Sequence, residues 1–281
     1  MFTNILTVKG KVRMFLSQVK TVLVDILNVK RKIILTKAWK NQKKKKRDKN
    51  ILIIANGPSF SSELAKNIIK NREYFDVLAM NNYCLNNFSE DLIPDYYLIS
   101  DPENIETENI EYKKINVELN KYISNERIKY LAPYGKMWES IKKPYLQFND
   151  SQNLSSSSID PIKPRGYRSN TAFKAIAISL ALNYSKIYIL GFDYEYPRKL
   201  IVSETNKIFL KNEFSFGEEK IDLSNSFESV AHAINWWAQD YWHLRKLKSP
   251  NVFNVTSNSM IDIFPRISPE NFFNEIIKIK K

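Results

Sequence analysis

The chain has 281 residues, 43% hydrophobic and 13% aromatic, enough to fill the core of one α/β domain with additions. Its net charge is +13, yet residues 1–49 hold 15 lysines and arginines against two acids, while residues 50–281 hold 28 of each sign. The main body is therefore neutral, which argues against nucleic acid as its ligand. Cys84 is the only cysteine, which excludes a disulfide within the chain and a cysteine-based metal cluster.

The first forty residues carry the apolar spacing of an amphipathic helix. The stripe consists of Val8, Val12, Phe15, Val19, Val22, Ile26, Val29 and Ile33. A run of basic residues, 43–47, follows it, and no apolar stretch is long enough to span a membrane. We expect residues 1–49 to form a basic helical extension that binds an anionic membrane surface. The alternative is a helix packed on the body or on another subunit, with the lysines as a solvated linker.

From residue 50 the pattern alternates between buried strands and helices. Expected strands are 51–55, 76–82, 94–101, 128–131, 145–148, 186–193 and 251–255, and expected helices are 61–74, 172–182, 226–247 and 268–280. Residues 149–165 are rich in Ser and Pro and predict a loop, and 196–225 predict an irregular lid over the site. The sequence thus predicts a single doubly wound, mostly parallel, Rossmann-like sheet over residues 50–281.

The first strand of this pattern ends in a turn that suits a phosphate. Asn56 and Gly57 follow four aliphatic residues, Pro58 suits the first turn of a helix, and Ser59 is a candidate cap. A glycine turn between a buried strand and a helix N-terminus is a common seat for an anion, although an ordinary strand-to-helix turn remains the alternative.

Other polar residues follow later strands or precede later helices. Asn81 and Asp101 end the second and third strands, and carboxyl ends of parallel strands share one edge of a sheet, where ligands bind. Arg168, Asn170 and Thr171 stand before an Ala-rich helix, which forms a second N-terminus suited to an anion.

Only two histidines exist, and His232 lies early in the long aromatic helix. A base of neutral pKa at that place could take a proton from an alcohol, and a packed helical histidine is the alternative. We expect no metal ligands, because His/Cys clusters and Asp-x-Asp are absent. Gly-x-Gly-x-x-Gly, P-loop and Gly-x-Ser-x-Gly patterns are also absent.

Taken together, several motifs resemble the bacterial sialyltransferases of glycosyltransferase family forty-two, the Campylobacter and Haemophilus lipooligosaccharide enzymes. They are Asn-Gly-Pro-Ser, Met-Asn-Asn, Ser-Asp, Arg-Ser-Asn-Thr, Ile-Tyr-Ile-Leu-Gly-Phe-Asp, an early helical His, and Asn258-Ser259 after the last strand. The resemblance covers about residues 50–262. It implies a variant of the GT-A glycosyltransferase fold and a peripheral enzyme on the inner face of the cytoplasmic membrane.

The resemblance further implies inverting, metal-independent transfer of sialic acid, or a related nonulosonic acid, from a CMP-activated donor to a sugar hydroxyl of a surface glycan or glycolipid. His232 would be the general base, and Arg168 would act beside it. The donor pocket would be formed by Asn56, Gly57, Ser59, Asn81, Asp101, Asn170, Thr171, Tyr194, Tyr196 and Asn258. No cofactor is implied, and a homo-oligomer is a further partner to test.

Two positions depart from that family. Asp101 stands where the family usually has Asn, so it would bond a ribose hydroxyl or a base amino group. Glu195 stands at the first of two tyrosines that hold the leaving phosphate, with Tyr194 and Tyr196 beside it. A second hypothesis is a pterin diphosphokinase-like protein using ATP and Mg²⁺, with Asp101 and Asp193 as metal ligands. A catalytically inactive scaffold is a third.

Overall fold

The structure, a computed structural model, describes residues 29–45, 47–105, 110–140, 142–150, 159–163, 170–223 and 230–278, together with Val12, Phe15, Leu16, Val19 and Leu23. Three residues of the predicted N-terminal stripe (Val8, Val22 and Ile26), residues 151–158 and 164–165 of the Ser/Pro-rich loop, and Arg168 lie outside these residues. No helix in the described ranges is both long enough and apolar enough to cross a bilayer.

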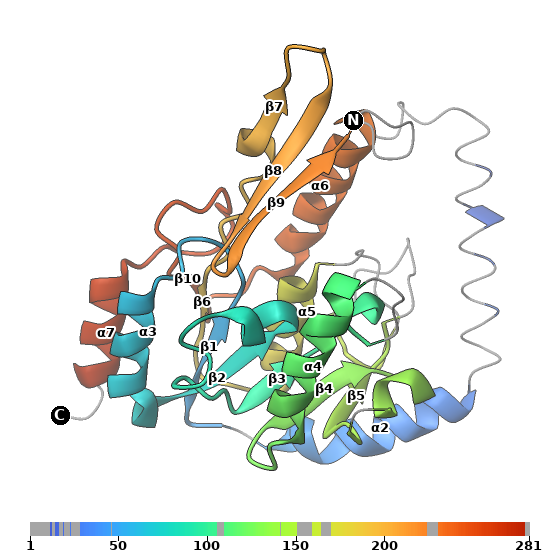
Figure 1. The fold of residues 1–281 in the computed structure, drawn as a ribbon. Coiled ribbons are helices and arrows are strands. Elements are labelled where there is room, and N and C mark those ends of the chain that lie inside the picture. The colour runs from blue at the N-terminus through green and yellow to red at the C-terminus, as the bar shows by residue number, and fades with distance from the viewer. Residues whose placement is uncertain are drawn as a thin grey trace.

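A seven-stranded parallel sheet forms the centre of the molecule (Figure 1). Its strands are β1 (Asn50–Ile54), β2 (Phe75–Met80), β3 (Tyr96–Leu98), β4 (Lys129–Pro133), β5 (Leu146–Phe148), β6 (Ile187–Leu190) and β10 (Val252–Asn254). Their order is β10-β6-β1-β2-β3-β4-β5, and each neighbouring pair is parallel. The chain moves outward from β1 to β5 and then returns to β6 on the other side of β1. The predicted doubly wound sheet is confirmed, and its topological switch point lies between β1 and β6.

Within the described ranges, six helices flank the sheet. They are α2 (Val29–Lys44), α3 (Ser62–Lys70), α4 (Ile110–Ser124), α5 (Thr171–Ala181), α6 (Val230–Leu244) and α7 (Pro269–Lys278). Short 3-10 turns lie between them: η2 (Arg72–Tyr74), η3 (Asn81–Leu85), η4 (Pro102–Asn104), η5 (Lys136–Glu139), η6 (Tyr196–Lys199) and η7 (Arg245–Leu247).

Both faces of the sheet are covered, which explains the unbroken apolar run of β1. Ile51 and Ile53 pack into one core with α5, and Leu52 and Ile54 pack into a second core with α3 and α7. All four side chains are fully buried. A strand buried on both faces needs apolar residues at every position rather than at alternate ones.

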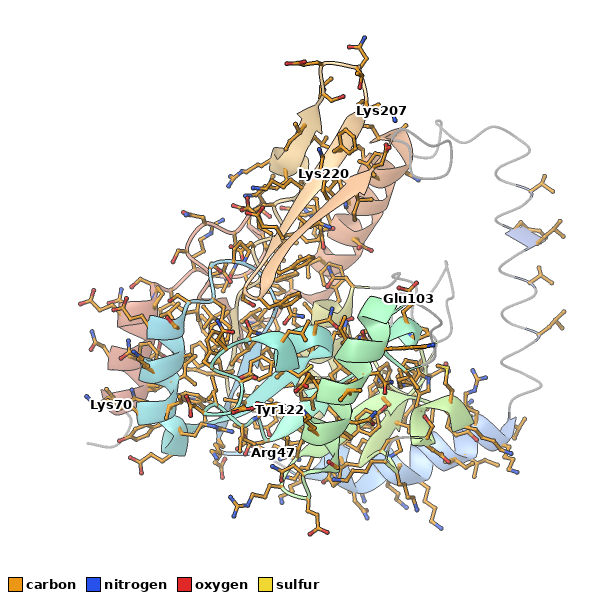
Figure 2. All side chains as sticks on the ribbon, in the orientation of Figure 1. Arg47, Lys70, Glu103, Tyr122, Lys207 and Lys220 are labelled. Atoms are coloured by element: carbon orange, nitrogen blue, oxygen red, sulfur yellow. The ribbon has the colours of Figure 1, made fainter. Side chains whose placement is uncertain are left out.

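The expectation that residues 196–225 are irregular was wrong. Residues 200–222 form a second sheet of three antiparallel strands, β7 (Leu200–Val202), β8 (Ile208–Phe214) and β9 (Gly217–Asp222), which rises from the carboxyl edge of the main sheet (Figure 1). The charged residues of β8 and β9 interrupt the alternation of apolar and polar residues by which strands are predicted, because a small exposed sheet needs few apolar positions. Lys207 lies at its outer end in Figure 2, far from the main sheet.

Part of the predicted extension packs on the sheet. Leu35 and Trp39 of α2 are fully buried, and the Trp39 ring nitrogen donates to the Gln147 carbonyl at 2.7 Å. The basic run is only partly a solvated linker, because Lys43 pairs with Asp160 and Arg47 donates to the Tyr96 hydroxyl at 2.9 Å. The main sheet begins at Asn50, and the division of the chain into units 1–49 and 50–281 stays a prediction.

Candidate active site

A cleft of about 660 Å³ lies at the carboxyl edge of the sheet, beside the switch point. Its floor comes from the turn after β1, the end of β2 and the start of α5, and its walls come from the loop after β6, from α6 and from the β8–β9 hairpin. Open α/β sheets bind ligands at this place because the loops on either side of the switch point diverge.

The turn after β1 fits closely against the loop after β6. The Gly57 N–H donates to the Gly191 carbonyl at 2.8 Å, and the Ser59 hydroxyl donates to Asp193 Oδ2 at 2.8 Å. A Cβ on Gly57 would lie 1.9 Å from that carboxylate oxygen, so only glycine permits the approach. Burial raises the pKa of Asp193, and the bonds from Ser59 oppose that rise. Asp193 therefore links the loop after β6 to the turn after β1, and the Ser59 hydroxyl is used in that link.

Asn56 lines the cleft and keeps one polar atom without a protein partner. Its Nδ2 donates to the Met80 carbonyl at 3.3 Å, which fixes the orientation of the amide. Its Oδ1 is buried and accepts no hydrogen bond within the described part of the chain. A ligand with an N–H or O–H group would satisfy it.

Asn81 connects the ends of two strands to helix α5. Its Nδ2 donates to the Thr171 hydroxyl at 3.0 Å, its Oδ1 accepts from the Ser100 N–H at 3.3 Å, and its φ is +44°. The Ser100 and Thr171 hydroxyls are 2.9 Å apart. A left-handed asparagine is uncommon and such strain concentrates at ligand sites. Asn81 and Thr171 line the cleft, but their side chains already hold its floor together.

Asn170 caps α5, with its side chain accepting the Ala172 N–H at 3.0 Å. The amino end of an eleven-residue helix therefore opens into the cleft, as the sequence predicted. Arg168, predicted at the same mouth, lies outside the described residues.

Asp101 lines the cleft and also caps η4 by accepting the Glu103 N–H at 3.3 Å. Burial raises the pKa of its carboxyl group, while the Lys174 ammonium acts in the opposite direction. Lys174 is itself 3% exposed and pairs with Asp150 at 2.7 Å. Asp101 is therefore a carboxylate whose ionised form is disfavoured in the folded protein.

Aromatic residues join the loop after β6 to helix α6. The Tyr194 hydroxyl donates to the Trp237 carbonyl at 3.2 Å, and the Tyr196 ring stacks on Trp237 with centroids 5.5 Å apart at 6°. Tyr194 has a φ of +54°. Its pKa is raised, mainly by burial and to a smaller extent by the nearby carboxylate of Asp240. Tyr194, Tyr196, Trp237 and Asp240 all line the cleft.

The β8–β9 hairpin reaches the floor through its tip. The Ser215 N–H donates to the Asn56 carbonyl at 2.9 Å. Next to the tip, Glu213 forms an ion pair with Lys199 of η6, which also pairs with Glu195. Asn212, Phe214, Phe216 and Glu218 complete this wall of the cleft.

The described lining is rich in carboxylates. Asp101, Asp193, Glu195, Glu213, Glu218 and Asp240 contribute them, and Lys199 is the one basic side chain among the described lining residues. Carboxylates accept hydrogen bonds from hydroxyl and amino groups, so the cleft suits a polyhydroxylated or amino-bearing ligand. Across the described ranges, no three His, Cys, Asp or Glu side chains are arranged to hold a metal ion.

Eight predicted site residues meet in the cleft: Asn56, Gly57, Asn81, Asp101, Asn170, Thr171, Tyr194 and Tyr196. Ser59 is turned to Asp193, and Asn258 is exposed outside the lining. The backbone of His232 lies in the first turn of α6, and its side chain is outside the described atoms.

Sequence reasoning missed the lining residues from the hairpin and from the middle of α6. Trp237 and Asp240 lie three residues apart on one face of that helix, a spacing that was available in the sequence. The hairpin residues gave no such signal, because the strands themselves were not predicted.

The doubly wound sheet, the cleft at its switch point and the hairpin over it define a Rossmann-like α/β protein. The sequence profile of the 6-hydroxymethylpterin diphosphokinase MptE-like family matches residues 26–199. Because the match spans more than half of the chain, the protein belongs to the MptE-like family. A comparison with curated protein sequences found no match.

Among solved structures, the fold is similar to that of the MAf glycosyltransferase from Magnetospirillum magneticum AMB-1, with a TM-score of 0.50 at 10% sequence identity. The similarity covers 89% of this chain and 41% of the MAf chain, so the present chain spans less than half of its length. At this identity the likeness concerns the fold alone. Neither comparison names a sialyltransferase, and that resemblance stays a prediction.

Proposed function

We propose that this protein is a glycosyltransferase that uses a nucleotide-activated sugar. The observation that carries the proposal is the cleft at the switch point, where eight residues expected for a donor pocket meet. A fold like that of the MAf glycosyltransferase supports the same class. The abundance of carboxylates suits a sugar ligand, because hydroxyl groups donate to them.

The donor is proposed to be a CMP-activated nonulosonic acid and the acceptor a glycan or glycolipid hydroxyl, with inversion and without a metal. The motifs shared with the sialyltransferases of family forty-two support this choice. In this proposal the amino end of α5 and Arg168 stabilise the leaving phosphate. His232 takes the proton of the attacking hydroxyl, so that one bond forms at the anomeric carbon while the bond to the phosphate breaks.

The decisive experiment replaces each of the two histidines. His232→Ala should lower the rate of sugar transfer by about 10²–10⁴-fold, the usual contribution of a general base. His243→Ala is the matched control, since it lies later on the same helix and is not assigned a catalytic role. CMP release and acceptor glycosylation measure the rate. Transfer by His232→Ala at the wild-type rate would exclude this role.

A second candidate follows from the family description, which names a pterin diphosphokinase. That reaction would use ATP and Mg²⁺, with Asp101 and Asp193 as candidate ligands of the metal. A thermal-shift screen of CMP, CDP, UDP and ATP, each with and without Mg²⁺, separates the candidates. Stabilisation by CMP alone supports the glycosyltransferase, and stabilisation by ATP only with Mg²⁺ supports the kinase. No stabilisation by any nucleotide would indicate an inactive scaffold.

We further propose that the enzyme works at the cytoplasmic face of a membrane through its N-terminal segment. Exposed apolar side chains support this, including Phe15 at 62% and Leu16 at 61% exposure. The excess of basic residues in the same segment is complementary to anionic lipid.

A further inference from the structure

The tip of the β8–β9 hairpin presents two aromatic rings to the cleft. The Phe214 and Phe216 rings have centroids 5.1 Å apart and an interplanar angle of 3°. Both rings line the cleft and both are partly exposed. Apolar rings left open to water inside a cleft full of carboxylates are costly unless a ligand covers them.

The hairpin tip has a fixed place beside the first turn of the fold. Phe214 pairs with Gly217 across a two-residue turn, Ser215–Phe216, and the Ser215 N–H donates to the Asn56 carbonyl. Neither turn residue has a positive φ, so the turn lacks the primed geometry that hairpins favour. The contact with Asn56 therefore helps to hold the tip, and the rings with it, against the turn that follows β1.

We propose that Phe214 and Phe216 form the stacking surface for the base of the nucleotide. This inference rests on the proposed use of a nucleotide-activated donor. Every nucleobase has an apolar π-face, and stacking on an aromatic side chain is a strong and sequence-tolerant contact. The surface lies against the turn at the switch point, which is where nucleotides bind in open α/β sheets.

The neighbouring Asn56 indicates which bases fit. Its buried Oδ1 has no partner in the described residues and its Nδ2 is held by Met80, so this site accepts but does not donate. The exocyclic amino group of cytosine or adenine supplies the missing donor. Uracil carries a carbonyl oxygen where cytosine carries its 4-amino group, so a pyrimidine oriented with this position toward Asn56 Oδ1 satisfies it only as cytosine. The surface and Asn56 together favour CMP or AMP over UMP.

Equilibrium binding to the full-length protein tests this inference. Phe214→Leu and Phe216→Leu should each weaken CMP binding by about 5- to 150-fold, the range for loss of one base–aromatic stack. Phe216→Tyr keeps the ring and should retain affinity. Phe209→Leu is the matched control, because Phe209 lies on the same strand and is not part of the lining. Ribose 5-phosphate, which has no base, should bind all variants equally.

The outcomes separate this inference from the proposed function. Sugar transfer by the wild type with unchanged CMP affinity in both leucine variants would overturn the stacking surface alone. A raised KM for the acceptor with unchanged CMP affinity would assign the rings to the acceptor sugar and overturn it as well. Ring-dependent binding of CMP without sugar transfer would retain the surface and overturn the glycosyltransferase. Thermal unfolding of each variant verifies that Phe209→Leu, Phe214→Leu and Phe216→Leu are equally folded.

Discussion

At the scale of single residues, the floor of the cleft consists of groups that serve the fold and the ligand together. Asn81 and Thr171 join β2, β3 and α5 through one hydrogen-bond network, and Asp193 accepts hydrogen bonds from Ser59. Groups held in this way keep fixed positions before a ligand arrives, which reduces the ordering cost of binding. Asp101 differs from these groups, because burial disfavours the charged form of its carboxyl group and raises its pKa.

Asp101→Asn should stabilise the protein at neutral pH. Because the pKa of Asp101 is raised in the folded state, the folded state binds its proton more tightly, and stability falls as pH rises from the ordinary value of 3.8 through the raised one. The Asn side chain can still accept from the Glu103 N–H without carrying the charge. We expect Tm to rise by about 1–3 °C at pH 7, a modest gain because solvent screens the site, and the gain to vanish near pH 3.5.

Differential scanning calorimetry between pH 3.5 and 7.5 measures this effect. Asp91→Asn, at an exposed position, is the control for loss of a negative charge. A gain that does not depend on pH would mean that burial of the carboxylate is not its cause.

The sequence predicts which residues lie at the ends of the strands, but it does not predict the hydrogen bonds that their side chains form. The end of a buried strand can be located in the sequence, so Asn56, Asn81 and Asp101 were expected at one edge. The pairing of Asn81 with Thr171 joins residues 90 positions apart. Such a contact depends on how α5 crosses the sheet, and no local pattern encodes that crossing. Ser59 was expected at the ligand for the same reason and faces Asp193 instead.

At the scale of elements, the central sheet and the hairpin sheet differ in how sequence specifies them. Strands of the central sheet are buried on both faces, so each is an apolar run that can be located directly. Lys211 of β8 forms an ion pair with Glu218 across the hairpin and another with Glu213 on its own strand. Cross-strand contacts of this kind and the docking of the tip do not appear as hydrophobic periodicity.

Ser215→Pro should release the hairpin from the floor while keeping its turn. Proline suits the first central position of a type I turn, but it removes the N–H that donates to the Asn56 carbonyl. We expect faster amide hydrogen exchange in residues 208–222 and unchanged exchange in β1, with a net loss of about 0.5–1.5 kcal/mol for the docked state. Hydrogen exchange read by mass spectrometry measures both segments.

Ser215→Ala is the control for this variant, because it keeps the backbone donor and loses only the hydroxyl, which lies 3.4 Å from the same carbonyl. Equal exchange in the two variants would show that the backbone bond does not hold the hairpin.

At the scale of the whole molecule, the charge is divided between the N-terminal segment and a neutral body. Arg47 lies at the amino ends of the strands, opposite the hairpin (Figure 2). Its guanidinium contacts Tyr96, Tyr184 and the Leu182 carbonyl, so this residue belongs to the body rather than to a linker. Four of the 15 basic residues of segment 1–49 precede α2, and Lys30, Lys32, Lys37 and Lys40 of α2 are exposed, so both parts present basic charge to a membrane.

Removal of residues 1–28 should weaken binding to anionic vesicles by at least about tenfold, since each basic residue near such a surface contributes about 1 kcal/mol. The shortened chain keeps α2, whose Leu35 and Trp39 belong to the core. Flotation with phosphatidylcholine vesicles, with and without phosphatidylserine, measures the binding, and added salt should reduce it. Unchanged flotation together with a fall in molecular mass in solution would assign the segment to a second copy of the chain instead.

The hydrogen bond between Ser215 and Asn56 has a spectroscopic consequence. It joins the hairpin wall of the cleft to its floor through one amide proton, so the ¹⁵N–¹H resonance of Ser215 reports the environment of the hairpin tip without any attached label. A nucleotide that stacks on Phe216 should broaden or shift that resonance as it binds. Titration of a serine-labelled sample would then give the exchange rate of the nucleotide as well as its affinity.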